Sequence, residues 1–115
     1  MSRTSEIRIQ VRLDEANVPD QIQWSATESE SPKFESAKGI LISIFEENSK
    51  DTLKLDLWTK GMQVEEMDRF MYQTIRALCD TYSKATNNQS LANDMMNFAQ
   101  YFGEKVEIIP PSTNT

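Results

Sequence analysis

Two different spacings of apolar residues divide the chain near Gly61. Before it, apolar and polar residues alternate in short runs, which is the period of a strand whose two faces meet different surroundings. After it, apolar residues recur every third or fourth position, as along one stripe of an amphipathic helix. The order of the two patterns predicts an α+β fold in which strands come first and helices follow.

Four runs in the first part predict strands. The alternating runs 6–13 and 21–24 are separated by turn residues, and 39–45 is separated from 53–58 by a polar turn. We expect two hairpins in one antiparallel sheet of about four strands. Residues 25–36, rich in Ser and Glu, predict a mobile surface loop, with Phe34 as its only anchor.

Parity along these strands predicts which side chains share a face, because successive side chains of a strand point to opposite sides. The apolar set expected to meet the helices is Ile7, Ile9, Val11, Ile22, Trp24, Ile40, Ile42, Ile44, Leu53, Leu55 and Leu57. The opposite face then carries Arg8, Arg12, Gln23, Leu41, Phe45, Lys54, Asp56 and Trp58. An apolar centre rimmed by charges is usual for a contact surface. We therefore predict a partner-contact face formed by Arg8, Arg12, Leu41, Phe45, Lys54 and Trp58.

Two amphipathic helices are predicted after Gly61. The stripe of the first is Val64, Met67, Met71, Ile75, Leu78 and Tyr82, and that of the second is Leu91, Met95, Phe98, Phe102 and Val106. Asn87 and Asn88 interrupt the two, and Ser90 is the expected N-cap of the second helix. We expect the pair to lie across one face of the sheet in a single domain over 1–109, followed by a flexible tail at 110–115.

The composition of the chain restricts its possible functions more than it restricts its possible folds. The chain has 115 residues, enough for one core, and 12 basic against 18 acidic residues give a net charge of −6. This charge disfavours nucleic acid and anionic membranes as partners. No apolar run approaches the roughly 20 residues that span a bilayer, and no signal core begins the chain, so we expect a cytoplasmic protein without membrane insertion.

No group of side chains predicts catalysis, cofactor binding or a metal. Histidine is absent, and with it the commonest general base and zinc ligand. The lone Cys79 borders the helical stripe and is better explained as a buried thiol than as a nucleophile. The carboxylates Glu28, Glu30 and Glu35 lack the spacing of a calcium loop. Those of Glu65, Glu66 and Asp68 suit the start of a helix dipole better than acid–base work.

Several large flexible or aromatic side chains could either pack in the core or form a binding surface. Methionines at 62, 67, 71, 95 and 96 could form an adaptable binding surface, although the spacing of Met67 and Met71 favours core packing. Trp24 is equally hard to dismiss, and Trp58 is out of phase with the leucines beside it. A large aromatic at an outward position is either covered by its own chain or contacts a partner.

Several segments resemble one known family. The opening Ser5-Glu6-Ile7-Arg8-Ile9-Gln10-Val11, the segment Ile22-Gln23-Trp24-Ser25-Ala26, and above all Thr52-Leu53-Lys54-Leu55-Asp56-Leu57-Trp58-Thr59-Lys60 resemble the gliding motility-associated protein GldC family. The likeness continues through Val64-Glu65-Glu66-Met67 and Tyr101-Phe102-Gly103-Glu104-Lys105. It implies a small protein associated with gliding in bacteria of the Bacteroidetes group, with no assigned chemical activity and no site residues to carry over.

Three functions compete on this basis. The favoured one is a non-catalytic accessory protein that binds a component of the gliding machinery, and a homodimer is left open. The second is an export chaperone or adaptor for unfolded or exported clients, because strands followed by two helices are similar in order to the SecB secretion chaperone. The third, an enzyme that uses carboxylates alone, has the least support. A defined stoichiometric partner would favour the first, and tight binding of non-native clients the second.

Overall fold

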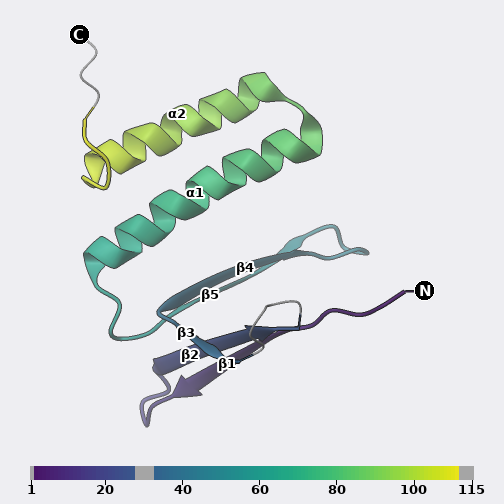
Figure 1. Cartoon of the computed structure of the whole chain (residues 1–115), viewed down its shortest axis with the longest axis vertical. Helices are drawn as coiled ribbons and strands as arrows, with labels where there is room; N and C mark the ends of the chain where they lie inside the picture. The colour runs from purple at the N-terminus through teal and green to yellow at the C-terminus, as the bar shows by residue number, and fades with distance from the viewer. Residues whose placement is uncertain (1, 28–32, 112–115) are drawn as a thin grey trace. The chain divides into compact units, whose positions relative to one another are not determined.

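The computed structural model describes residues 2–27 and 33–111. It divides into two compact units, a strand unit over Met1–Met62 and a helix unit over Gln63–Thr115. The strand unit holds β1 (Ile7–Leu13), β2 (Pro19–Ala26), β3 (Glu35–Ala37), β4 (Gly39–Phe45) and β5 (Thr52–Trp58). The helix unit holds α1 (Val64–Thr86) and α2 (Gln89–Lys105), as Figure 1 shows. The α+β class and the order of strands before helices are confirmed.

Strands β1 and β2 form the first predicted hairpin, lying side by side in Figure 1. Their register pairs Ile9 with Trp24 and Val11 with Ile22, so the predicted apolar set of this hairpin does share a face. Ile22, in the central strand, is fully buried. In the connecting turn, one carboxylate oxygen of Asp14 accepts hydrogen bonds from the N–H groups of Ala16 and Val18, at 2.8 and 3.0 Å.

The bounds of the predicted loop 25–36 were too wide. Ser25 and Ala26 end β2, while Glu35 and Ser36 belong to β3, which pairs antiparallel with β2. The strand was missed because it has only three residues and its sequence is mostly polar, so its ladder with β2 has to specify it. The mobility of the loop stays a prediction, and residues 28–32 lie outside the described part of the chain.

The predicted single sheet of about four strands is wrong, because the five strands form a three-stranded and a two-stranded sheet. At Lys38 the chain changes from pairing with β2 to pairing with β5. Ala37 still pairs with Ile22 of β2, whereas the Lys38 carbonyl accepts a hydrogen bond from the Thr59 N–H at 2.8 Å and the next residue pairs with β5. Two successive strands, β3 and β4, separated only by a bend at Lys38, therefore supply an edge to each sheet.

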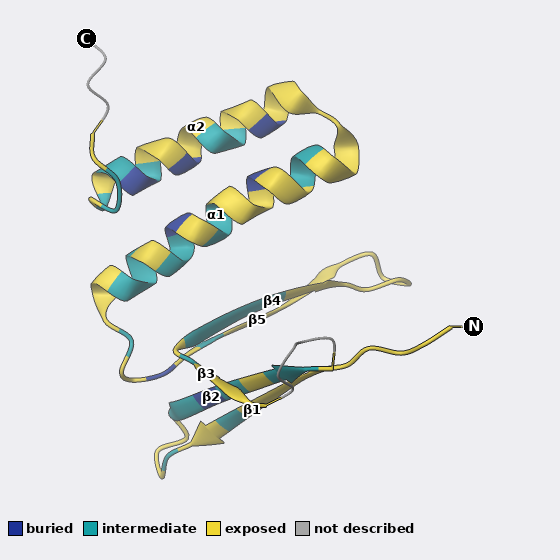
Figure 2. Ribbon diagram, viewed as in Figure 1, coloured by how far each residue is buried: buried dark blue, intermediate teal, exposed yellow. Residues whose placement is uncertain are grey.

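Strands β4 and β5 form the second predicted hairpin. In its turn, the Glu46 carboxylate accepts hydrogen bonds from the N–H groups of Asn48 and Ser49, at 2.8 and 2.7 Å. Figure 2 shows β4 changing from half-buried to exposed as it approaches this turn. The hairpin is anchored at its base and exposed at its tip.

The two helices are antiparallel neighbours joined by a tight connection (Figure 1). Asn87 ends α1 in the left-handed conformation, with φ 57°, and the side chain of Asn88 accepts a hydrogen bond from the Leu91 N–H at 3.2 Å. Asn88, not the expected Ser90, is thus the N-cap of α2. At the start of α1, Glu66 accepts a hydrogen bond from the Gln63 N–H at 2.9 Å, so this carboxylate caps the helix.

Apart from Tyr72, the buried residues of the helix unit are small. Its buried residues are Tyr72, Cys79, Ala92, Ala99 and Gly103. In the predicted stripes, Val64, Leu78, Leu91 and Phe98 are instead exposed. Alanine and glycine let two helices approach closely. The predicted stripes did not include them because the prediction was based on large apolar residues. The packing of the helix pair across a sheet, the single domain over 1–109 and the flexible tail stay predictions.

Candidate partner-contact surface

The outer face of the β4–β5 hairpin gathers four of the six residues predicted to contact a partner. The register places Leu41 opposite Asp56, Lys54 opposite Ser43, and Phe45 opposite Thr52. Trp58 lies opposite Gly39, which has no side chain to cover the indole ring. Cross-strand neighbours share a face, so Leu41, Phe45, Lys54 and Trp58 do project to one side of the hairpin. We call this the outer hairpin face.

The aromatic side chains of this face are open to solvent. Phe45 is 68% exposed and Trp58 is 51% exposed, whereas Leu41 between them is half-buried. The Lys54 ammonium lies 3.7 Å from the Asp56 carboxylate, and both side chains are largely exposed. Two aromatic groups thus lie beside a neutralised ion pair, a composition that allows contact with an apolar surface without desolvating an unpaired charge.

Arg8 and Arg12 lie apart from that face, on the three-stranded sheet. The Arg8 Nε is 3.3 Å from a carboxylate oxygen of Glu6, and the Arg12 Nε is 2.9 Å from one of Asp20. Both guanidinium groups therefore already have a carboxylate partner within the strand unit. The six-residue face predicted from parity belongs to two sheets, because parity was extended across a sheet that is in fact divided.

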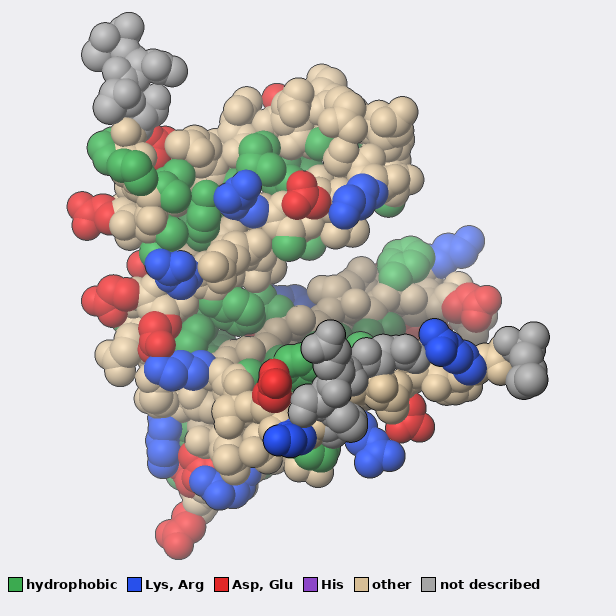
Figure 3. All heavy atoms as spheres, viewed as in Figure 1, with side chains coloured by type: hydrophobic (Ala, Val, Ile, Leu, Met, Phe, Trp, Pro, Cys, Tyr) green, Lys and Arg blue, Asp and Glu red, His purple; other side chains and the backbone are tan. Residues whose placement is uncertain are grey.

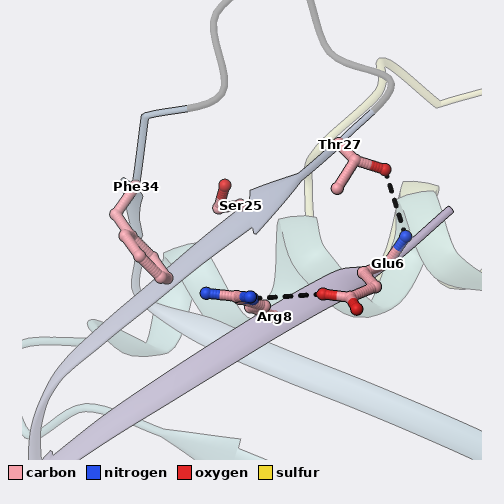
Figure 4. A pocket seen from close by; sticks show the side chains of 5 residues that line it. All are labelled: Glu6, Arg8, Ser25, Thr27 and Phe34. Carbon is pink, nitrogen blue, oxygen red and sulfur yellow. Dashed lines mark hydrogen bonds and ion pairs between the residues drawn. The ribbon is translucent and has the colours of Figure 1, made fainter.

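Arg8 lines a shallow cavity of about 200 Å³ together with Glu6, Ser25, Thr27 and Phe34. Figure 4 shows the Phe34 ring pointing toward the Arg8 guanidinium, while the Thr27 hydroxyl accepts a hydrogen bond from the Glu6 N–H at 3.1 Å. Phe34 was expected to anchor the loop, and it contributes the apolar wall of this cavity. The arrangement closes the end of the first hairpin, and the acidic group among its described residues, Glu6, is paired with Arg8.

A second cavity, of about 230 Å³, adjoins Trp58. Val18 and Pro19 line it with Asp56, Leu57 and Trp58. The Lys60 N–H donates to the Pro19 carbonyl at 3.2 Å, and the Lys60 ammonium lies 3.0 Å from an Asp14 carboxylate oxygen. These contacts hold the β1–β2 turn beside the end of β5. Sequence reasoning missed them because nothing local in either segment indicates that the two meet.

The opposite, inner face of the hairpin is also exposed. Register pairs Ile40 with Leu57, Ile42 with Leu55, and Ile44 with Leu53, as parity predicts. Leu53 is nevertheless 60% exposed, and Ile44 and Leu55 are exposed as well, so the strand unit does not bury this face near the turn.

The other groups considered for chemistry have structural surroundings. Cys79 is 2% exposed and its thiol donates to the Ile75 carbonyl at 3.2 Å, which confirms the buried thiol. The pKa of the Asp14 carboxyl is lowered, chiefly by the hydrogen bond from the Val18 backbone. The pKa of the Glu46 carboxyl is lowered in the same way, chiefly by the hydrogen bond from the Ser49 backbone. Within residues 2–27 and 33–111, no three acidic, Cys or His side chains gather as metal ligands.

Charges of both signs are scattered over the visible face in Figure 3 rather than collected in one patch. Neither helix in the described part of the chain is long and apolar enough to cross a membrane.

These features define a small α+β protein whose charged side chains form turns, caps and exposed ion pairs, and whose most open aromatic groups include those of a β-hairpin. The model of the gliding motility-associated GldC-like family matches residues 19–108. The chain belongs to this family, as the resemblance implied. No curated protein and no solved structure matches the chain.

Proposed function

We propose that this chain is a non-catalytic accessory protein that works in the cytoplasm by binding a protein component of the gliding machinery. Membership of the GldC-like family provides the biological setting. The observation that supports binding is the outer hairpin face, where Phe45 and Trp58 are exposed beside the Lys54–Asp56 ion pair.

Trp58 is the expected anchor of this contact. Its ring lies opposite a glycine and beside the cavity lined by Val18 and Pro19, so an apolar side chain of the partner has both a surface and a recess to occupy. Buried aromatic anchors often lose 2 kcal/mol or more of binding free energy when truncated at an interface. Arg8 and Arg12 belong to the proposal only as a second, separate patch.

Affinity purification from a gliding cell, with crosslinking to retain weak contacts, tests the proposal. We expect the wild-type chain to capture one motility component in a stoichiometric ratio and Trp58→Ala to lose it. Tyr101→Ala is the matched control, because Tyr101 is also an exposed aromatic residue but lies on α2. Equal loss with both variants, or full capture by Trp58→Ala, would show that the outer hairpin face is not the contact.

The exposed inner face favours a second candidate, an export chaperone or adaptor. Ile44, Leu53 and Leu55 offer an apolar strip that suits extended non-native clients. This function predicts that the chain suppresses aggregation of several unrelated unfolded proteins. Binding of one folded component without such suppression would leave only the first function.

A further inference from the structure

The outer edge of β5 carries hydrogen-bonding groups that no strand in the described part of the chain pairs with, although the start of β2 lies beside its end at Trp58. The bonds Glu46 N–H to Asp51 carbonyl, 2.9 Å, and Thr59 N–H to Lys38 carbonyl, 2.8 Å, fix which pairs of the hairpin are hydrogen-bonded. In an antiparallel ladder such pairs alternate, so the N–H and C=O groups of Thr52, Lys54 and Asp56 point away from β4. Among the described residues, no backbone hydrogen bond reaches these three positions.

This edge has neither the proline nor the bulge that often protects an edge strand, and its charged residues, Lys54 and Asp56, are of opposite sign. β5 contains no proline, and its pairing with β4 runs without a register shift over all seven residues. A two-stranded sheet is marginally stable in water, and three or more strands are normally needed. The β4–β5 hairpin, with Leu53 and Leu55 exposed on its inner face, would therefore gain stability from a further strand.

The charges along β5 select a second copy of β5 as that strand. In an antiparallel pair centred on Leu55, Lys54 of each copy lies opposite Asp56 of the other, forming two cross-strand ion pairs. Leu55 then lies opposite its own copy and Leu53 opposite Leu57, which continues the apolar inner face. The hydrogen-bonded pair in this register joins Lys54 and Asp56, the positions whose backbone groups point outward.

Other symmetric registers are disfavoured. A shift by two residues in one direction places Lys54 opposite Lys54, and in the other direction Asp56 opposite Asp56. Like charges directly opposite each other destabilise a ladder. A shift by one residue would mismatch outward-pointing and inward-pointing backbone groups. Val18 and Pro19 line a cavity with Asp56, Leu57 and Trp58, and the Lys60 N–H donates to the Pro19 carbonyl. The start of β2 therefore limits this end of the edge, and the new ladder is confined to residues 53–57.

We propose that two copies of this chain associate antiparallel through β5, with a two-fold axis at Leu55, and form a continuous four-stranded sheet in the order β4, β5, β5, β4. The interface uses the backbone edge of β5 together with Lys54 and Asp56, which lie on the outer hairpin face. Phe45 and Trp58 lie outside the five-residue ladder, so the dimer presents these two aromatic groups twice. Edge pairing over so few residues buries little area, and we expect a weak, reversible dimer.

Charge exchange tests the register. Lys54→Glu and Asp56→Lys should each weaken the dimer roughly tenfold or more, because both ion pairs become like-charge pairs. An equimolar mixture of the two variants should recover association, since each new charge then meets its opposite across the interface. A loss caused only by breaking the ion pair within each chain would not be recovered by mixing. Sedimentation velocity over roughly 10 to 500 μM measures the association, and circular dichroism verifies that each variant is folded.

A disulfide test locates the axis. Leu55→Cys should form a covalent dimer under mild oxidation, because the two residues form a non-hydrogen-bonded pair with Cα atoms about 4.5 Å apart. Leu53→Cys is the matched control, since it lies on the same exposed face but four positions away from its own copy's equivalent across the ladder. Wild type, whose lone cysteine is buried, should stay uncrosslinked. Monomeric wild type throughout the concentration range, or faster crosslinking of Leu53→Cys than of Leu55→Cys, overturns the proposal.

Discussion

The ring of Tyr72 in α1 lies directly against Gly103 in α2. A Cβ atom at residue 103 would lie 2.6 Å from Cε1 of Tyr72 and 3.0 Å from Cγ1 of Ile109. Tyr72 and Gly103 are both buried, so the glycine allows the aromatic ring to fill the space between the helices. A side chain larger than that of glycine at residue 103 would therefore disturb the packing of α1 against α2.

Gly103→Ala is expected to destabilise the protein despite the higher helix propensity of alanine. The added methyl group forces the Tyr72 ring or the backbone to shift, and overpacking of this kind costs about 1–3 kcal/mol, against roughly 1 kcal/mol gained in propensity. Urea unfolding followed by circular dichroism measures the difference. Gly61→Ala is the control, because its Cβ would come no closer than 4.0 Å to Thr59. Equal stability of both variants would show that the Tyr72 ring relaxes without loss.

Truncation should locate the end of the helix unit between Ile109 and Pro110. The N–H groups of Ile108 and Ile109 both donate to the Gly103 carbonyl, at 2.9 and 3.3 Å, as the chain turns back at Glu107 with φ 62°. Deleting 110–115 should leave the melting temperature almost unchanged. Deleting 108–115 should lower it by about 5 °C or more, which corresponds to roughly 1 kcal/mol. A similar fall with the shorter deletion would show that the tail is docked.

Asp14 should make stability depend on pH in the acid range. Hydrogen bonds from the Val18 N–H and from Lys60 lower the pKa of its carboxyl below the ordinary value of 3.8. Because the folded-state pKa is the lower one, the stabilisation is present above pH 3.8 and is lost as the pH falls through the folded pKa. Asp14→Asn should therefore be less stable than wild type at neutral pH, with the difference shrinking in acid. Urea midpoints at pH 7 and near pH 3 test this, and a constant difference contradicts it.

Local alternation in the sequence was enough to predict the faces of both hairpins. Parity placed Trp58 on the side of Lys54, and the observed register agrees. The division into two sheets could not be found that way, because the change of partner at Lys38 depends on Thr59, far along the chain. For the same reason the Val18–Pro19 wall of the cavity beside Trp58 was missed.

The helices illustrate a different limit. Periodicity identified both of them, yet it selected the large apolar residues as the buried stripe. Ala99 and Gly103 are buried instead, and Gly103 leaves the space that the Tyr72 ring occupies. A hydrophobicity pattern records the side chain itself and not the space that a small side chain leaves for a neighbour.

Trp58→Ala should weaken partner binding much more than folding. Half of the Trp58 side chain is already in contact with solvent, and the residue opposite it is Gly39, so truncation removes little packing within the strand unit. We expect a loss of about 1 kcal/mol or less in the free energy of unfolding, well below the 3–5 kcal/mol typical of a buried tryptophan. Urea unfolding gives this value, and the capture experiment gives the binding.

Ile22→Ala supplies the opposite pattern as a control. Ile22 is 0% exposed at the centre of the three-stranded sheet, so its truncation should cost about 2–5 kcal/mol of stability. Any loss of capture by this variant should follow its unfolded fraction, whereas loss by Trp58→Ala should occur in a folded protein. If Trp58→Ala instead unfolds as readily as Ile22→Ala and binds its partner normally once folded, Trp58 belongs to the core and the outer hairpin face is not a contact surface.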